Sequence, residues 1–474
     1  MKANKLLLIA AICAAFALTC HADNRWRSEV DRLIQAGEFA RAEQVMKRLP
    51  KAERTRCEVQ IDSLCTIMQR IRKDFTMTPE QGVALIRERM PNVTPEQITD
   101  WKANHKLEYM VIDGKEWWFR KSVRNLWLLA DEFKDEQDAD KEQSYASRRR
   151  YYLEAMQTPA DANGCRDRRH VAITFTLDVD ADAVPAGETI RAWMPFPYEN
   201  LRQTGIRYTG GNRPVTFSTG SRHHTVYMEA TAVKGQPTHF EYSFEYDVAE
   251  RHIAQQDLLA MLEPYDKQSE LYRRYTGNDG PHIQISPESI SLAREIVGDE
   301  TNPVLQAAKI YYWISKSFPW AGAREYSTIP NMPQYVMEHR HGDCGQVALL
   351  YITLARSLGI PARWESGWML HPGEVNWHDW AETYFEGVGW VPTDPSFGRS
   401  TVDTPMNDYY ATGIDLYRMA SNETVGDRLS PPKKFIRSET VDFQPGEVEW
   451  RGGNLYYDCW HSRLTVNSIE KINK

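Results

Sequence analysis

The hydrophobic pattern of residues 23–160 is mainly helical, because apolar side chains near its start recur three and four positions apart. Thr78–Gln81 and Thr94–Gln97 both read Thr-Pro-Glu-Gln. Each places a capping threonine before a proline at the first helical position, with a glutamine that can complete a capping box. Asp113-Gly114 separates two apolar runs and predicts a β-hairpin. We therefore expect a mainly helical N-terminal domain with a β-hairpin.

The period changes to two after residue 164. Apolar side chains alternate with smaller or polar ones in two segments, at Val171, Ile173, Phe175 and Leu177 and again at Phe240, Tyr242, Phe244 and Tyr246. Turn-rich segments lie between them. This alternation is typical of strands with one buried face. We expect residues 165–252 to form an antiparallel β domain.

Helical and strand patterns mix from residue 285 to residue 400. The segment from Cys344 to Leu358 is almost continuously apolar and is followed by Gly359, which predicts a buried helix with Asp343 as its N-cap. Strand patterns follow it. We expect residues 285–400 to form a core of helices and sheet. Residues 401–474, which end in a closing hairpin, would be a C-terminal extension completing that core. The predicted fold class is α+β, with several domains.

The first residues have the pattern of an export signal. Lys2 and Lys5 precede thirteen apolar residues, which is too short to cross a bilayer but right for a signal peptide. Residues 1–22 are the expected signal. Processing before Cys20, with lipid attached to that cysteine, is the alternative and would tether the protein to a membrane. In either case the protein would be exported to the periplasm, the cell surface or the medium.

Composition narrows the function classes only a little. A chain of 474 residues with 42% hydrophobic and 26% charged residues is typical of a soluble protein of two to four domains. The net charge of −8 gives no sign of a nucleic-acid partner. The sequence contains no HExxH motif, no metal-ligand spacing and no glycine-rich phosphate loop. We expect neither a metal nor a cofactor, and the sequence leaves the oligomeric state open.

Five cysteines remain after removal of the signal: Cys57, Cys65, Cys165, Cys344 and Cys459. An odd number leaves at least one thiol outside any internal disulfide. The pairing of the others stays open. Cys344 is the strongest candidate for the free thiol, and it can be a buried side chain or a nucleophile. At the first turn of its helix, free N–H groups and the helix dipole favour a thiolate.

A histidine and an aspartate follow Cys344 in the order that a nucleophile needs. Residues 377–395 read as strand, glycine-containing turn and strand, and this fold-back brings Asp394 beside the stretch that contains His378. The turn leaves an offset of up to about three residues, roughly 10 Å of strand, that a bulge or an asymmetric turn must absorb. Cysteine, histidine and aspartate form a nucleophile–base–orienter set. His371 is a weaker candidate base, because no carboxylate partner follows it.

Four motifs together resemble the transglutaminase-like superfamily. They are Gly342-Asp343-Cys344, then Ala355–Arg363, then His378-x-Trp380-x-Glu382-x-Tyr384, then Gly389-Trp390-x-Pro392-x-Asp394-Pro395. The resemblance implies a papain-like core with Cys344 as nucleophile, His378 as general base and acid, and Asp394 as orienter. It also implies that Trp320, upstream of the cysteine, helps to hold the oxyanion. Residues 441–450 resemble the C-terminal extension of exported bacterial members.

Such a set performs acyl transfer on a peptide or protein substrate. If water resolves the thioester the enzyme is a peptidase or amidase, and if an amine does it is a transglutaminase. We expect hydrolysis, with amine transfer as one alternative and a non-catalytic binding module on the same fold as another. Five of the fifteen tryptophans lie within residues 364–390. Trp368 and Trp377 flank the loop 369–376 and are the expected cleft residues.

Overall fold

The computed structural model describes residues 25–397 and 408–472. The predicted signal peptide and Cys20 lie outside these residues. Within the described part, no helix is long and apolar enough to cross a membrane. The chain forms two compact units, residues 1–127 and residues 128–474, and each is described by itself.

The first unit is helical with one small sheet. Its helices pack around a core that includes Leu33, Phe39 and Ile71. Its antiparallel sheet has the order β1-β3-β2. After a helix at residues 25–35, the elements are α2 (Phe39–Arg48), α3 (Lys51–Arg56), α4 (Glu58–Asp74), β1 (Phe75–Met77), α5 (Pro79–Arg89), α6 (Pro95–Ala103), β2 (Tyr109–Ile112), β3 (Lys115–Phe119) and α7 (Ser122–Leu129), which continues two residues into the second unit.

The local signals in this unit are confirmed. Thr78 and Thr94 each form a capping box with the glutamine three residues on, and the following proline opens helices α5 and α6. Strands β2 and β3 pair as the hairpin predicted at Asp113-Gly114. Both glycine and aspartate there have positive φ, as a type I′ turn requires.

The second unit opens with η1 (Asp131–Phe133) and the long helix α8 (Lys134–Met156), and two antiparallel sheets follow. One has the order β13-β9-β4-β17 with β6 also on β9, and the other has the order β16-β15-β5-β8-β7. The strands are β4 (Cys165–Val179), β5 (Thr189–Pro195), β6 (Gln203–Gly211), β7 (Thr216–Phe217), β8 (Thr225–Thr231), β9 (Thr238–His252), β13 (Gly413–Ile414), β15 (Glu447–Trp450), β16 (Gly453–Leu455) and β17 (Trp460–Lys471).

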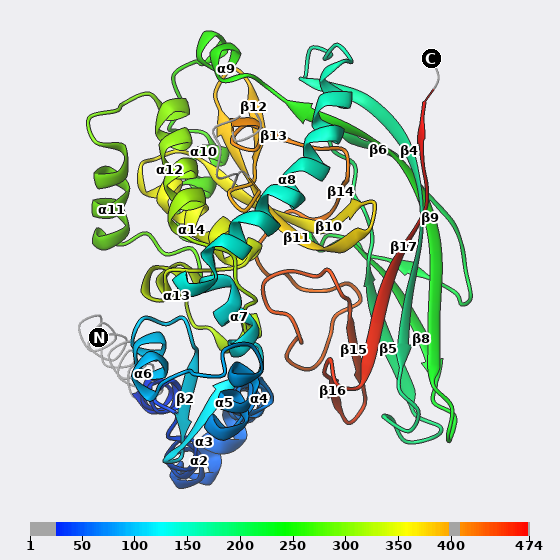
Figure 1. The fold of residues 1–474 in the computed structure, drawn as a ribbon. Helices are drawn as coiled ribbons and strands as arrows, with labels where there is room; N and C mark the ends of the chain where they lie inside the picture. Colours follow the sequence, from blue (N-terminus) through cyan, green and yellow to red (C-terminus); the bar gives the residue numbers. More distant parts are fainter. Residues whose placement is uncertain (1–24, 398–407, 473–474) are drawn as a thin grey trace, which may run out of the picture. The chain divides into compact units, whose positions relative to one another are not determined.

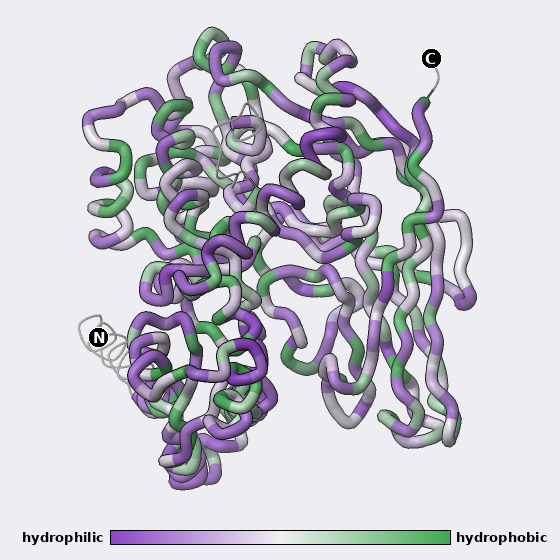
Figure 2. Tube along the Cα trace, in the orientation of Figure 1, coloured by the Kyte–Doolittle hydropathy of each residue, from purple (hydrophilic) through white to green (hydrophobic). Residues whose placement is uncertain are grey.

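Strands β4 and β9 confirm the alternating pattern. Val171, Phe175 and Leu177 are fully buried on one face, and they are opposed on β9 by Tyr246, Tyr242 and Phe240 in that order. Figure 2 shows hydrophobic and hydrophilic residues alternating along these long strands. The hairpin expected near the C-terminus is the pair β15–β16. Its strand β15 pairs with β5, and β17 pairs with β4, so the last strands of the chain join the sheets of residues 165–252.

The rest of the second unit places helices against a four-stranded sheet of order β12-β11-β10-β14. Helix α14 is the central helix, and α11, α12 and α13 pack against it. The elements are α9 (Gln255–Met261), α10 (Glu270–Tyr275), α11 (Pro287–Val297), α12 (Pro303–Ser317), η2 (Tyr326–Thr328), α13 (Met332–His339), α14 (Cys344–Ser357), β10 (Ala362–His371), β11 (Glu374–Phe385), β12 (Gly389–Thr393) and β14 (Arg418–Asn422).

The four-stranded sheet contributes to two cores. Trp364, Ala381 and Val391 pack with the helices around α14, whereas Trp368 and Met419 pack with the sheets of the β domain. Figure 1 shows the helices and the long strands within this unit on either side of β10 and β11. The architecture is the α+β fold predicted from the sequence, with helices in the N-terminal part.

Candidate active site

Cys344 is the first residue of α14, as predicted. The Asp343 side chain accepts the Gln346 backbone N–H at 3.1 Å, and the Gln346 side chain accepts the Asp343 N–H at 3.1 Å. This capping box satisfies one free donor of the first turn and leaves the Cys344 N–H without an intrahelical acceptor. Residues 345–356 of the helix are buried, and the Cys344 side chain is half-buried. The sequence therefore places a thiol where a buried helix meets the surface.

His378 and Asp394 are joined by a hydrogen bond. His378 lies on β11, and Asp394 follows the last residue of β12. The distance from His378 Nε2 to Asp394 Oδ2 is 2.6 Å, and both side chains are buried. Because Nε2 is occupied by this bond, Nδ1 is the ring nitrogen left for another partner. The structure thus brings together the histidine and the aspartate that the sequence paired.

The offset between the two strands is small and needs no bulge. Ala381 pairs with Thr393 and Phe385 with Gly389, without a register shift. The next register position puts Asp394 opposite Trp380, two residues from His378. His378 and Trp380 project to the same face of the strand, and their rings stack at 6.0 Å. The imidazole therefore spans the offset by itself.

A buried arginine holds Asp394 from the other side. Arg418 Nη2 lies 3.5 Å from Asp394 Oδ2, and the Ser396 hydroxyl donates to Asp394 Oδ1 at 2.8 Å. Burial acts to raise the pKa of Asp394, but His378 and Arg418 outweigh it and lower that pKa. Burial lowers the pKa of His378 more than Asp394 raises it. The pair therefore consists of the neutral imidazole of His378 hydrogen-bonded to the ionised carboxylate of Asp394.

The Cys344 sulfur has a carboxyl group as its neighbour. Cys344 Sγ donates to Asp379 Oδ2 at 3.5 Å. Burial, followed by the charges of Asp379 and Asp343, raises the pKa of Cys344 well above its ordinary value. The helix N-terminus was expected to favour the thiolate and so to lower the pKa of Cys344, but the surroundings raise that pKa instead. Desolvation and two acidic neighbours outweigh the helix dipole, and the thiol is protonated at rest.

The three tryptophans expected around the site lie in different settings. Trp320 is 42% exposed and forms a bridge with Gly342, two residues before Cys344. Trp377 is 44% exposed, whereas Trp368 is buried and its indole N–H donates to the Gln444 carbonyl at 3.1 Å. Their roles at the oxyanion or in a cleft stay predictions.

His371 has the carboxylate partner that the sequence did not reveal. His371 Nε2 lies 3.3 Å from Asp415 Oδ2, and Arg418 lies beside both. The reason given against His371 from the sequence was therefore wrong. Burial lowers the pKa of His371, and Asp415 and Arg418 engage its ring in a buried network.

Four residues of the site were missed by the sequence analysis. Asp379 contacts the thiol, Gln444 donates to the His378 carbonyl at 3.0 Å, Arg418 pairs with Asp394, and the Phe397 ring lies 4.6 Å from the His378 ring. Asp379 lies inside the predicted motif, next to His378. Gln444 lies in residues 441–450, whose resemblance to a C-terminal extension gave it no role at the site, and Arg418 lies in a later segment than the four motifs, without a local signal.

The five described cysteines form no disulfide with one another, so the pairings left open by the sequence do not form here. Among the described residues, no group of three or more histidine, cysteine, aspartate or glutamate side chains is arranged to hold a metal ion.

Residues 290–395 match the family model of the transglutaminase-like superfamily. They form a transglutaminase-like domain. The matched segment contains α12, α14 and the hairpin β11–β12, and it ends one residue after Asp394. Every residue of the predicted triad therefore falls within it.

Curated relatives share parts of the chain. An uncharacterized protein of Bacillus subtilis, YebA, is 33% identical over 95 residues, which are 16% of this chain and 13% of that protein. The chain thus spans only a small part of that relative's length. An uncharacterized protein of Haemophilus influenzae is 23% identical over 255 residues, covering 47% of this chain and 67% of that protein.

Solved structures with detectable likeness are more distant. A protein of Cytophaga hutchinsonii, provisionally described as a cysteine protease, is 16% identical with a TM-score of 0.41, covering 64% of this chain and 91% of that chain. The periplasmic domain of TgpA from Pseudomonas aeruginosa is 18% identical with a TM-score of 0.24, covering 48% of this chain and 88% of that domain.

Proposed function

We propose that the transglutaminase-like domain is a thiol acyl-transfer enzyme that hydrolyses peptide-type amide bonds through Cys344, His378 and Asp394. The observation that carries this proposal is the buried hydrogen bond of 2.6 Å between His378 and Asp394. It lies on strand β11, against which the Cys344 helix packs. A histidine oriented by a carboxylate, together with a thiol at the N-terminus of the helix packed on the same strand, fits nucleophilic catalysis.

The first step forms a thioester. Cys344 passes its proton to His378 Nδ1, and the sulfur attacks the carbonyl carbon of the amide. The C–N bond of the resulting tetrahedral species breaks, and the protonated imidazole gives its proton to the departing amine. Asp394, whose pKa is lowered by His378 and Arg418 against the effect of burial, stays ionised and stabilises the imidazolium.

The second step releases the acyl group. His378 takes a proton from water, the water oxygen bonds to the thioester carbonyl carbon, and the C–S bond breaks to return the thiol. The backbone N–H of Cys344 and the side chain of Trp320 are the proposed oxyanion donors. Trp377, exposed beside His378 on β11, is the proposed contact for a peptide substrate.

We also propose that the protein acts outside the cytoplasm. The apolar run that begins at Leu6 supports export. Peptide or protein in that compartment would then be the substrate, and attachment of lipid at Cys20 would keep the enzyme on a membrane.

The first experiment reads product masses. The pure protein is incubated with a peptide library, with and without a primary amine. We expect peptide fragments in both reactions. Cys344→Ala would abolish them, with a loss of activity of at least about a thousandfold. Cys459→Ser is the matched control, because Cys459 is also a half-buried cysteine of the second unit, and it keeps full activity.

The other outcomes give different answers. Amine adducts without fragments would replace hydrolysis by amine transfer. Absence of both, with Cys344 intact, would overturn the enzymatic proposal and favour a binding module. Fragments formed equally well by Cys344→Ala would exclude Cys344 as the nucleophile.

A further inference from the structure

Asp379 lies between the Cys344 thiol and a second carboxyl group. Its Oδ2 accepts from Cys344 Sγ at 3.5 Å, and its side chain hydrogen-bonds to that of Asp442. Two carboxyl groups form such a bond only when a proton is shared between them. Both side chains are buried, at 3% exposed each. A chain of proton-sharing groups therefore runs from the sulfur through Asp379 to Asp442.

The Asp379 carboxyl is fixed in place by its neighbours. Gln444 Nε2 donates to Asp379 Oδ1 and also to the His378 carbonyl. Gly345 leaves room for it, because a Cβ at that position would lie 2.6 Å from Asp379 Oδ2 and closer still to the Tyr326 hydroxyl. The glycine next to Cys344 therefore allows the carboxyl to approach the sulfur.

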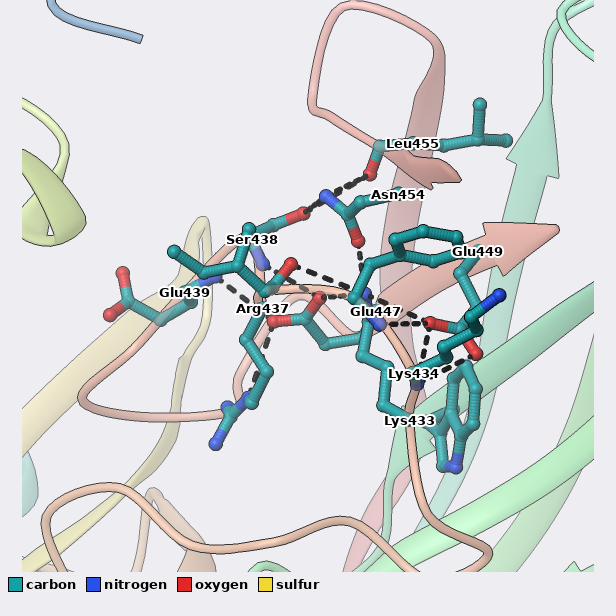
Figure 3. Close-up of polar contacts among 12 residues, drawn as sticks. Lys433, Lys434, Arg437, Ser438, Glu439, Glu447, Glu449, Asn454 and Leu455 are labelled. Atoms are coloured by element: carbon teal, nitrogen blue, oxygen red, sulfur yellow. Dashed lines mark hydrogen bonds and ion pairs between the residues drawn. The ribbon is translucent and has the colours of Figure 1, made fainter. Parts of the chain in front are cut away.

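The segment that supplies Asp442 and Gln444 is anchored by two buried glutamates at the start of β15 (Figure 3). Glu447 accepts the backbone N–H of Ser438 at 2.8 Å and that of Glu439 at 3.0 Å. Glu449 accepts the backbone N–H groups of Lys434 and Phe435 at 3.0 and 3.1 Å. These bonds hold residues 434–439 against β15, and this stretch leads into Asp442 and Gln444.

The charges around the thiol and Asp379 are mostly acidic. Burial, followed by the charge of Asp343, raises the pKa of Asp379 well above its ordinary value, and burial followed by Asp379 does the same to Asp442. The titratable and charged groups that act on the pair are Asp343, Tyr326, Asp394, Arg437, Glu439 and Asp442.

We propose that Asp379, bonded to Asp442, is the proton partner of the Cys344 sulfur, so that thiol and carboxyl ionise as one coupled pair. Asp379 in its neutral form donates its O–H to the thiolate. Asp379 in its charged form accepts the S–H and keeps the sulfur protonated. The inference rests on the proposed function in taking Cys344 as the nucleophile, and it makes Asp379 a positioning residue that sets the pH at which this nucleophile is available.

The wild-type protein tests the coupling directly. Iodoacetamide alkylates the thiolate: the sulfur displaces iodide, and the thiol proton passes to solvent. The rate of alkylation at Cys344 is measured by peptide mass spectrometry at a series of pH values. Coupled sites lose their protons in two macroscopic steps. We therefore expect the alkylation rate to rise in two steps, with a plateau between them where one proton is shared by sulfur and carboxyl. A single-step curve would overturn the inference.

Asp379→Asn removes the coupling and keeps the shape. We expect one step at lower pH and, at neutral pH, alkylation roughly 3- to 30-fold faster than in wild type. One negative charge beside a group shifts its pKa by about 1–3 units, and a more acidic thiolate is a somewhat weaker nucleophile. Asp178→Asn, at an exposed carboxylate on β4, is the matched control and leaves the curve unchanged.

Folding is followed in the same reaction. Cys165 is buried at 4% exposed, so its slow alkylation in each variant shows that the second unit is folded. A curve for Asp379→Asn equal to that of wild type, or a slower rate, would overturn the inference. The proposed function fails separately, because it is judged by peptide products, whereas the alkylation curve needs no substrate.

Discussion

Among the residues of the site, Arg418 is the one whose replacement is expected to lower the stability of the protein most. Its side chain is fully buried, and its guanidinium lies 3.5 Å from Asp394 and 3.2 Å from Asp415. Breaking a buried ion pair by removing one partner costs about 3–5 kcal/mol, because a charge stays buried without compensation. We expect Arg418→Leu to lower the free energy of unfolding by about that amount at pH 7, measured by chemical denaturation. Arg451→Leu, at an exposed ion pair with Glu188, is the control and has a much smaller effect.

The same variant has a defined pH dependence. Burial tends to raise the pKa of Asp415, but Arg418 and His371 outweigh it and hold that pKa below its ordinary value. The pKa of Asp394 is lowered in the same way, by His378 and Arg418. A lowered folded-state pKa gives stability that is present above the unfolded value of about 3.9 and is lost as pH falls through the folded value. The deficit of Arg418→Leu is therefore largest near neutral pH and shrinks below about pH 4. A deficit that grows on acidification would contradict the ion-pair account.

At the scale of elements, the hairpin β11–β12 places the histidine and aspartate. Gly387 lies in its turn and Gly389 is the first residue of β12, and both have positive φ. A Cβ on Gly387 would collide with the Met261 carbonyl oxygen, whereas one on Gly389 meets nothing within 4 Å. We expect Gly389→Ala to cost on the order of 1 kcal/mol from backbone strain alone, and Gly387→Ala to cost more. Denaturation followed by alkylation of the buried Cys165 measures both, and equal losses would show that the contact with Met261 is unimportant.

Elements with local signals could be predicted from the sequence. The caps at Thr78, Thr94 and Asp343 and the turn at Asp113-Gly114 are set by residues within four positions of one another, and all four are confirmed. The pairing of His378 with Asp394 also follows from one short turn. Local chemistry therefore sufficed for the helix of the thiol and for the hairpin beside it.

The parts of the site that depend on distant segments could not be predicted. Arg418 reaches Asp394 from β14, and Gln444 reaches Asp379 from 65 residues away along the chain. The pKa of Cys344 was misjudged for the same reason, because the helix position is local, whereas its burial and the Asp379 side chain depend on tertiary packing. The pattern of a strand shows which side chains lie on each face of the sheet, but it does not show which segments pack against that face.

At the scale of the molecule, the site is built from residues of the second unit. Every proposed catalytic residue lies in residues 128–474, and so does helix α8. The Arg148 guanidinium of α8 stacks 4.0 Å over the Phe397 ring, which in turn contacts His378. Tyr151 and Tyr152 pack on Tyr417 and Tyr409, with ring centroids 4.8 and 5.0 Å apart. Helix α8 thus covers one side of the site within its own unit.

This arrangement predicts where the chain can be shortened. A protein of residues 128–474 is expected to fold, with the same alkylation curve at Cys344 as the full chain, because it keeps α8 and the neighbours of the site named above. A protein of residues 160–474 would expose Phe397, Tyr409 and Tyr417, and each large aromatic side chain left exposed forfeits about 1.5–3 kcal/mol. We expect its unfolding midpoint in denaturant to fall sharply and Cys165 to be alkylated faster. If both shortened chains behaved alike, α8 would be dispensable to the second unit, and the coupling of this helix to His378 through Phe397 would be refuted.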